Sequence, residues 1–262
     1  MKFGLLAGRG LYPVLLARRL VEDGHSVVVV GLAGQYAKGS VPDALAETIA
    51  PVGALGKAAS FFTKHGVTDG FMAGGVMRKG VWRYVRPDMM AMLLLPRVVF
   101  KGDDFLLREV AKKFEKCGIK IKDPSRYLET DFAGQGHIAG GALPSDKDGD
   151  LRLAWKAAVA HGCSDMGQTA IVHKGRVVGL EGRRGTDALL SCAPGPGAVM
   201  AKVVKPGQDR RFDMPAIGPS TAIIASMVGL RAIIVEAGGV LLIDKERLFA
   251  VCNRTGVCLV GK

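Results

Sequence analysis

The stretch KPGQDRRFDMPAIGPST, residues 205–221, concentrates groups that can do chemistry in one short segment. It has neither the 3.6-residue period of a helix nor the alternation of a strand, and prolines stiffen both of its ends. Lys205 and Gln208 stand near its beginning, and Asp213 stands further on between two apolar residues. A rigid loop of this kind is suited to place a lysine beside a phosphate and a carboxylate beside a metal ion or a water.

Two glycine turns in the first third of the chain are candidate anion sites. AGRG at 7–10 follows an apolar stretch and opens an amphipathic run, so its glycines let backbone amides approach an anion. Gly74 follows the apolar stretch 70–73, at the edge where ligands of open parallel sheets bind. Pro13 occupies the third glycine position of the dinucleotide fingerprint, and the acid expected about 20 residues on is missing. NAD binding is therefore disfavoured, and a different nucleotide, a phosphate or a plain strand–helix turn stays open.

Two further segments carry polar groups of interest. In EGRRGTD, residues 181–187, Gly185 supplies a turn, Thr186 can cap a helix and Asp187 can ligate a hard cation. Between residues 78 and 86, four cations alternate with Trp82 and a tyrosine. That mixture suits an anionic substrate, a nucleic acid or a lipid surface, and it is also common in a solvated loop.

The elements that must position these residues predict two α/β domains. Apolar strands alternate with amphipathic helices through residues 1–122, which predicts a Rossmann-like domain with a parallel sheet. Glycine, aspartate and proline accumulate in 123–150, which we interpret as a linker or crossing segment. Residues 151–262 predict a second α/β domain with a mixed sheet, including a hairpin around Lys174-Gly175.

Composition narrows the class of protein. The formal net charge is +12 over 262 residues, which favours anionic partners without choosing among them. The five cysteines form no CxxC pair, so we expect reduced thiols and a cytoplasmic protein. No signal peptide is indicated, and the longest apolar run is too short to cross a bilayer.

Several motifs together resemble one enzyme family. The loop at 205–221 resembles K-P-x-Q-D-x-R-x-D-x-P-x-I-G-x-x-T, the signature of UDP-2,3-diacylglucosamine pyrophosphatases of the LpxI type. GTDA at 185–188, KGDDFLLREV at 101–110 and AGRGLYP at 7–13 resemble the family's E-G-T-D, K-G-D-D-x-L-L-R and A-G-x-G-x-L-P. MGQTAIV and EAGG match further blocks, so the likeness runs in order along nearly the whole chain.

The resemblance implies a two-domain enzyme of bacterial lipid A synthesis. Such an enzyme hydrolyses the pyrophosphate of UDP-2,3-diacylglucosamine to UMP and 2,3-diacylglucosamine 1-phosphate (lipid X), with magnesium or another divalent cation. It further implies a cytoplasmic protein with a glycolipid nucleotide substrate and peripheral contact with the inner membrane surface. No nucleic-acid partner is expected, and a homodimer is left open.

The site residues are carried over from the same motifs. The family's essential aspartate aligns with Asp213, for which we expect magnesium ligation or orientation of the attacking water. Lys205 would offset phosphate charge, and Gln208 would orient a phosphate oxygen or the water. The further metal ligands expected are Asp187 and Glu236. The expected substrate-binding residues are Gly8, Gly10, Gly74, Asp103, Thr186, Lys202 and Thr221.

Three departures from the family pattern leave alternatives open. Arg9 stands where a small residue is usual, Gly75 where Asn or Lys is common, and Arg184 replaces the acid before G-T-D. A related pyrophosphatase or nucleotide-binding enzyme with a different substrate is therefore one alternative. A non-enzymatic basic protein that binds anions is the other.

Overall fold

The computed structural model describes residues 1–77, 83–92, 103–143, 145–164, 166–182, 184–192 and 195–262. The contacts divide the chain into two compact units. The first comprises Met1–Leu128 with Asp209–Asp213, and the second comprises Glu129–Gln208 with Met214–Lys262. The segment Asp209–Asp213, which the sequence assigned to the C-terminal domain, is thus grouped with the N-terminal unit.

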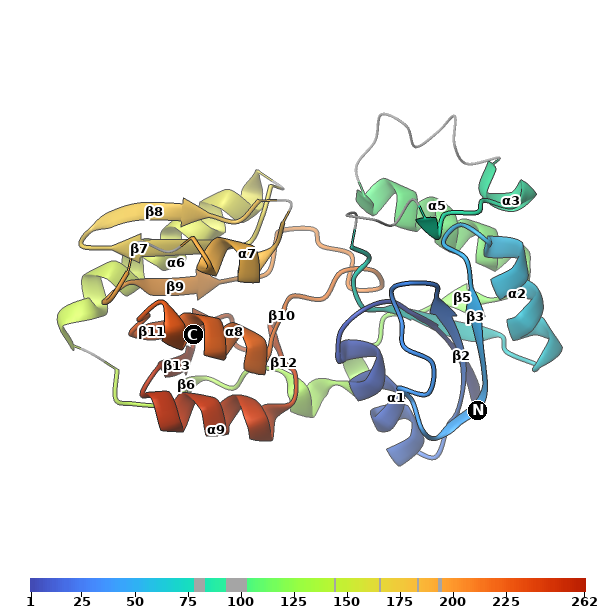
Figure 1. The fold of residues 1–262 in the computed structure, drawn as a ribbon, viewed down its shortest axis with the longest axis horizontal. Helices are drawn as coiled ribbons and strands as arrows, with labels where there is room; N and C mark the ends of the chain where they lie inside the picture. Colours follow the sequence, from blue (N-terminus) through green and yellow to red (C-terminus); the bar gives the residue numbers. More distant parts are fainter. Residues whose placement is uncertain (78–82, 93–102, 144, 165, 183, 193–194) are drawn as a thin grey trace. The chain divides into compact units, whose positions relative to one another are not determined.

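The first unit is built on a five-stranded sheet in which every pair is parallel (Figure 1). Its strands are β1 (Lys2–Ala7), β2 (Ser26–Leu32), β3 (Ala44–Ala50), β4 (Asp69–Ala73) and β5 (Lys120–Ile121). The order is β3-β2-β1-β4-β5, so the chain reverses its direction of winding between β1 and β4. Ligands of open parallel sheets bind at the carboxyl ends of the strands at such a point.

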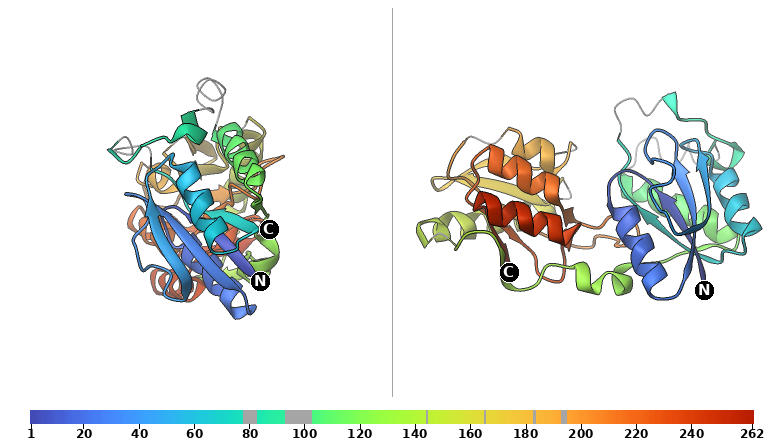
Figure 2. Two further views of the ribbon diagram at one scale, coloured as in Figure 1. Left: turned by 90° about the vertical axis from the view of Figure 1, so that its right-hand side faces the viewer. Right: turned by 60° about the horizontal axis from the view of Figure 1, so that its bottom comes forward.

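Helices cover both faces of this sheet. They are α1 (Tyr12–Glu22), α2 (Leu55–Lys64), α3 (Met89–Met92) and α5 (Asp103–Lys116), with the 3₁₀ turn η2 (Ser125–Tyr127). Figure 2 shows α1 on one side of the strands and α2 on the other. The helices α2 and α5 share a core, in which the rings of Phe62 and Phe114 lie 6.1 Å apart. Pro13 lies in the first turn of α1. Proline is tolerated there because the amides of the first turn have no acceptor within the helix, so its missing N–H costs no hydrogen bond.

The second unit is built on a six-stranded mixed sheet of order β6-β13-β11-β9-β7-β8. Its strands are β6 (Gly136–Ala139), β7 (Thr169–His173), β8 (Arg176–Leu180), β9 (Val199–Lys202), β11 (Ala232–Val235) and β13 (Cys258–Gly261). The central strands β9, β11 and β13 are parallel, and β6, β7 and β8 join by antiparallel pairing. A separate parallel pair is formed by β10 (Ala216–Ile217) and β12 (Leu241–Leu242).

Helices also cover both faces of the second sheet (Figure 1). They are α6 (Asp148–Cys163), α7 (Thr186–Leu190), α8 (Pro219–Met227) and α9 (Lys245–Thr255), with short 3₁₀ turns at Glu129–Asp131 and Ser145–Lys147. Successive side chains of β9 point to opposite faces of the sheet and so enter two different cores. Met200 packs in the core with α7, α8 and α9, and Ala201 packs in the core with α6.

The structure confirms the predicted fold class, an N-terminal Rossmann-like parallel sheet followed by an α/β unit with a mixed sheet. It also contains the predicted hairpin, in which Lys174 and Gly175 have φ of 49° and 73°. Positive φ at both turn residues matches the right-handed twist of the strands, and glycine adopts it without strain.

Other details differ from the prediction. The segment interpreted as a linker contributes β6, which pairs with β13 in the main sheet. The helix α9 was not predicted. Gly218 is the N-cap of α8, and Pro219 follows it in the first turn.

In the described parts of the chain, no helix combines the length and the apolar character needed to cross a bilayer. All five cysteines are free; Cys163 and Cys192 are exposed, whereas Cys252 and Cys258 are buried. Burial raises the pKa of the Cys252 thiol to about 11, so this thiol stays protonated at neutral pH.

Candidate active site

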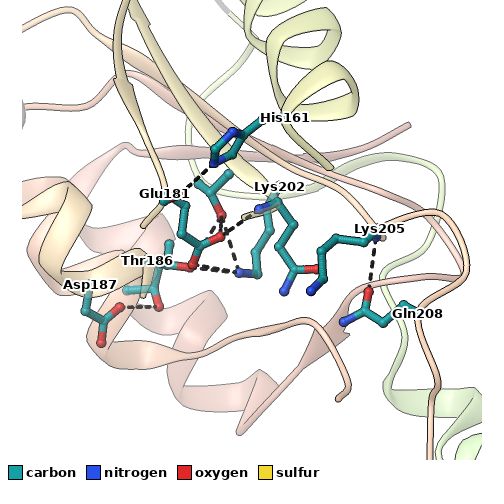
Figure 3. A network of polar contacts seen from close by, with 10 residues as sticks. His161, Glu181, Thr186, Asp187, Lys202, Lys205 and Gln208 are labelled. Atoms are coloured by element: carbon teal, nitrogen blue, oxygen red, sulfur yellow. Dashed lines mark hydrogen bonds and ion pairs between the residues drawn. The ribbon is translucent and has the colours of Figure 1, made fainter. Parts of the chain in front are cut away.

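A buried ion pair lies at the end of β9 in the second unit (Figure 3). The side chain of Lys202 is held near the carboxylate of Glu181, the residue that follows β8, with Nζ and Oε1 3.7 Å apart. The two residues are 3 % and 8 % exposed. Charges this deeply buried are found in native proteins when they are paired and hydrogen-bonded.

Two threonine hydroxyls complete the pair. Thr186 donates to Glu181 Oε1 at 2.7 Å and accepts from Lys202 Nζ at 2.7 Å. Thr169 donates to Glu181 Oε2 at 2.8 Å. We call these four residues, Glu181, Lys202, Thr169 and Thr186, the buried ion network. Figure 3 shows the side chains of Glu181, Thr186 and Lys202 directed toward one another.

The network keeps Glu181 ionised. Burial acts to raise the pKa of Glu181, but Lys202 and the hydrogen bonds from Thr186, Thr169 and the Gln168 amide outweigh it, so the pKa is lowered. His161 Nε2 lies 2.6 Å from the backbone oxygen of Glu181, which also fixes this part of the chain. The carboxylate is therefore a stable negative charge that holds its neighbours in place.

The network reaches the candidate metal ligand Asp187 through the first turn of α7. Thr186 is the first residue of that helix, and Asp187 is the second. Thr221 of α8 donates from its hydroxyl to Asp187 Oδ1 at 3.0 Å. Three of the residues predicted from the sequence, Thr186, Asp187 and Thr221, are thus connected with Lys202 in one chain of contacts (Figure 3).

The loop that follows β9 is held by side chains as well. Gln208 Oε1 accepts from the Lys205 amide at 3.1 Å, and Figure 3 shows the Gln208 side chain directed at the main chain of Lys205. Glu236 Oε2 accepts from the Val204 amide at 2.9 Å. One oxygen of this predicted metal ligand is therefore used to fix the start of the loop.

The tip of the loop, Asp209–Asp213, belongs to the first unit. Asp209 accepts two hydrogen bonds from the Arg211 guanidinium, at 2.9 and 2.7 Å, and lies 3.7 Å from Arg108 of α5. These hydrogen bonds hold the pKa of Asp209 below its usual value. Phe212 packs against the core that α2 and α5 share. Asp213, half-buried, is carried by this anchored tip.

At the carboxyl edge of the first sheet, glycines let the turns after β1 and β4 meet. The Gly8 amide donates to the Ala73 oxygen at 2.8 Å, and the Arg9 amide donates to the Gly75 oxygen at 2.8 Å. A Cβ on Gly8 would lie 2.6 Å from the Gly75 oxygen, and one on Gly74 would lie 2.6 Å from the Arg9 oxygen. These two amides are used within the chain, so close packing is one physical reason for the glycines.

Comparison with known proteins identifies the family to which the chain belongs. A family model described as the LpxI N-terminal domain matches residues 2–130, and one described as the LpxI C-terminal domain matches residues 134–260. The chain belongs to the LpxI family. A relative from Caulobacter vibrioides, described as UDP-2,3-diacylglucosamine pyrophosphatase LpxI, is 32% identical over 274 aligned residues. The alignment covers 99% of this chain and 97% of the relative.

The predicted site residues of this LpxI chain fall in three places. Asp213 lies in the loop tip of the first unit, with Gly8, Gly10 and Gly74 at the sheet edge of that unit. In the second unit, Lys202 and Thr186 belong to the buried ion network, and Asp187 and Thr221 are connected with it through α7. Lys205 and Gln208 lie on the loop after β9, and Glu236, which follows β11, contacts that loop. Asp103 is the first residue of α5, but its side chain lies outside the described part of the chain. The roles of all these residues stay predictions.

Two of the residues that depart from the LpxI pattern are exposed arginines. Arg9 is exposed and its guanidinium contacts the sulfur of Met77, and Arg184 is exposed too. Glu181 supplies the carboxylate that contacts Thr186, so an acid is present beside G-T-D in space although Arg184 precedes it in sequence. Most of the segment with alternating cations and aromatics, residues 78–82, lies outside the described residues.

The sequence reasoning missed Glu181 and Thr169 as functional candidates. A signal was present, because Glu181 is a charged residue at the end of an alternating hairpin, and a charge that becomes buried there needs a partner of opposite charge. That partner, Lys202, is on β9, which pairs with β7 rather than with β8. The pairing could be found only by knowing the order of the strands.

The described residues suit a magnesium ion that is held partly by the substrate. Among the described residues, no three His, Cys, Asp or Glu side chains are grouped so that they could hold a metal ion. Magnesium typically keeps several waters and is held by one or two carboxylates together with substrate phosphates. The half-buried carboxylate of Asp213 suits that mode of binding, in which the substrate supplies the remaining oxygens.

Proposed function

We propose that this protein hydrolyses the pyrophosphate bond of UDP-2,3-diacylglucosamine, as a step of lipid A synthesis. Water adds across the P–O–P bridge, which releases UMP and 2,3-diacylglucosamine 1-phosphate. The observation that carries the proposal is the 32% identity, over 99% of the chain, to a relative described by that activity. The order and spacing of the charged loop from Lys205 to Thr221 support it.

The residues have distinct roles in this proposal. Asp213 orients the attacking water or holds magnesium against the substrate phosphates, because a hard cation prefers carboxylate oxygens. Magnesium, when bound, would neutralise charge that develops on the phosphate oxygens. Lys205 offsets phosphate charge, and Gln208, which contacts the Lys205 amide, orients a phosphate oxygen or the water.

The buried ion network has a supporting role. Its ammonium and carboxylate contact each other and two hydroxyls, so it orders the first turn of α7 that carries Asp187. Side chains that act on a substrate work best when packing and hydrogen bonds lock their positions. Magnesium dependence, a cytoplasmic location and peripheral membrane contact stay predictions, and a homodimer is left open.

The direct test measures UMP release from UDP-2,3-diacylglucosamine with and without magnesium. Asp213→Asn is expected to fold normally and to lose turnover by about 10²–10³-fold or more, because the charge at the reacting centre is removed. Asp148→Asn is the matched control, since Asp148 forms an exposed pair with Arg152 and is expected to keep full turnover. Undiminished hydrolysis by Asp213→Asn would refute the role of Asp213, and the absence of UMP release from the unaltered protein would refute the activity.

A further inference from the structure

A buried hydroxyl in the first unit lacks a partner. Tyr12 is the first residue of α1, directly after the glycine turn. Its hydroxyl is shielded from solvent, and within the described ranges of the chain no group hydrogen-bonds to it. Native proteins pair nearly all of their buried polar groups, because an unpaired one loses its hydration without compensation. The unpaired hydroxyl of Tyr12 follows the carboxyl end of β1, the edge at which ligands of open parallel sheets bind.

Tyr12 belongs to the same compact unit as the loop tip that carries Asp213. Tyr12 follows the carboxyl end of β1 and Asp123 follows that of β5, so both lie at the same edge of the parallel sheet. The turn η2, which begins two residues after Asp123, contacts α1. Asp213 is grouped with the same unit, and the carboxylates of Asp123 and Asp213 both act electrostatically on the phenol. We call these three residues the tyrosine–carboxylate cluster.

The phenol of this cluster is a hydrogen-bond donor. Burial raises the pKa of Tyr12 above its usual value, and Asp123 and Asp213 raise it further, so the hydroxyl stays protonated. Asp123 Oδ1 is already used, because it accepts from the Ser125 amide at 2.8 Å and the Ser125 hydroxyl at 2.5 Å. Arg211 lies within the electrostatic reach of Asp123, so a cation accompanies the carboxylates.

We propose that the Tyr12 hydroxyl donates a hydrogen bond to a phosphate oxygen of the bound substrate, beside Asp213. The inference rests on the proposed function, since it takes the pyrophosphate to lie where Asp213 acts. A phosphate oxygen is a strong, charged acceptor, and hydrogen bonds to charged acceptors are stronger than neutral ones.

The test is Tyr12→Phe, which removes one oxygen and keeps the ring. In the unliganded protein we expect a melting temperature equal to or above that of the parent, because an unpaired buried hydroxyl is lost. With UDP-2,3-diacylglucosamine as substrate we expect kcat/KM to fall by about 10- to 100-fold. In an Asp213→Asn background, we expect the substrate to raise the melting temperature less when Tyr12→Phe is added.

Tyr36→Phe is the matched control. Tyr36 is buried in the same unit, but its hydroxyl donates to Glu47 at 2.5 Å. Its removal is expected to lower the melting temperature and to leave kcat/KM unchanged. The two tyrosines therefore predict opposite patterns for the same chemical change.

Two results would overturn the inference. A lower melting temperature for unliganded Tyr12→Phe would show that the hydroxyl has a structural partner. A kcat/KM within twofold of the parent, or an unchanged response to substrate, would show that the hydroxyl does not contact it. Either result leaves the proposed function standing, whereas a parent that releases no UMP refutes the proposed function and the inference together.

Discussion

The buried ion network and the Tyr12 hydroxyl of the tyrosine–carboxylate cluster are both buried and polar, but only the network is satisfied from within. Glu181 of the network takes hydrogen bonds from two hydroxyls and a backbone amide and is paired with Lys202. In the cluster, the Tyr12 hydroxyl has no hydrogen-bond partner among the residues that the structure describes.

This difference separates two uses of buried polar groups. A fully satisfied network rigidifies the fold, so removing a member should destabilise the protein. A buried donor without a partner lowers the stability of the free protein and gains its partner from a ligand. The first pattern indicates a positioning device, and the second indicates a surface that contacts substrate. Substitutions in the two regions should therefore change stability with opposite sign.

The largest effect is expected from Lys202→Met. This change leaves the Glu181 carboxylate buried without its counter-ion, which should lower the free energy of unfolding by about 3–5 kcal/mol. Urea unfolding followed by circular dichroism measures it. The double variant Lys202→Met with Glu181→Gln should lose less than the single variant, because no unpaired charge is left. Equal losses in the two variants would show that the pair is not the source of the stability.

A smaller effect is expected from Thr186→Val. This change removes the hydroxyl that bridges Glu181 and Lys202, and should lower the free energy of unfolding by about 1–3 kcal/mol. Thr186→Ser keeps the hydroxyl and should retain most of the stability, which makes it the matched control. If valine and serine destabilise the protein equally, packing of the methyl group is responsible and the bridge is not.

The pH dependence of stability should reveal the same network. The folded-state pKa of Glu181 is below its unfolded value of about 4.3. The stabilisation is therefore fully present above that unfolded value and is lost as the pH falls through the folded pKa. Denaturant unfolding of the parent and of Glu181→Gln should differ most above pH ~5 and converge in more acidic solution. A difference that stays constant down to pH ~3 would contradict a lowered pKa.

The smallest effect is expected from Asp209→Asn in the loop tip. Its partners Arg211 and Arg108 are 35% and 49% exposed, so water screens these pairs. The free energy of unfolding should fall by only about 0.2–1 kcal/mol. High salt should reduce the difference from the parent, because it screens exposed charges further. If Asp209→Asn lowered the free energy of unfolding as much as Lys202→Met does, the exposed pairs of Asp209 would be as stabilising as the buried pair, which would contradict this prediction.

Much of the fold could be predicted from the residues alone because its signals are local. The run SVVVVG predicts a buried strand, and the strand β2 is buried on both faces as parallel strands are. Lys174-Gly175 predicts a two-residue hairpin, since those positions need positive φ. The helix α9 was missed although its buried face recurs at Leu248, Val251 and Cys252, which is helical spacing.

The family could also be predicted from sequence, because the motif at 205–221 preserves residue types in order. What only the tertiary structure shows is which groups meet. Glu181 and Lys202 come from strands that are not neighbours in the sheet, and Tyr12, Asp123 and the loop tip come from distant parts of the chain. Local pattern determines the strands and helices through backbone geometry and burial. The partners of a buried charge or hydroxyl depend on strand order and loop anchoring, which no local period encodes.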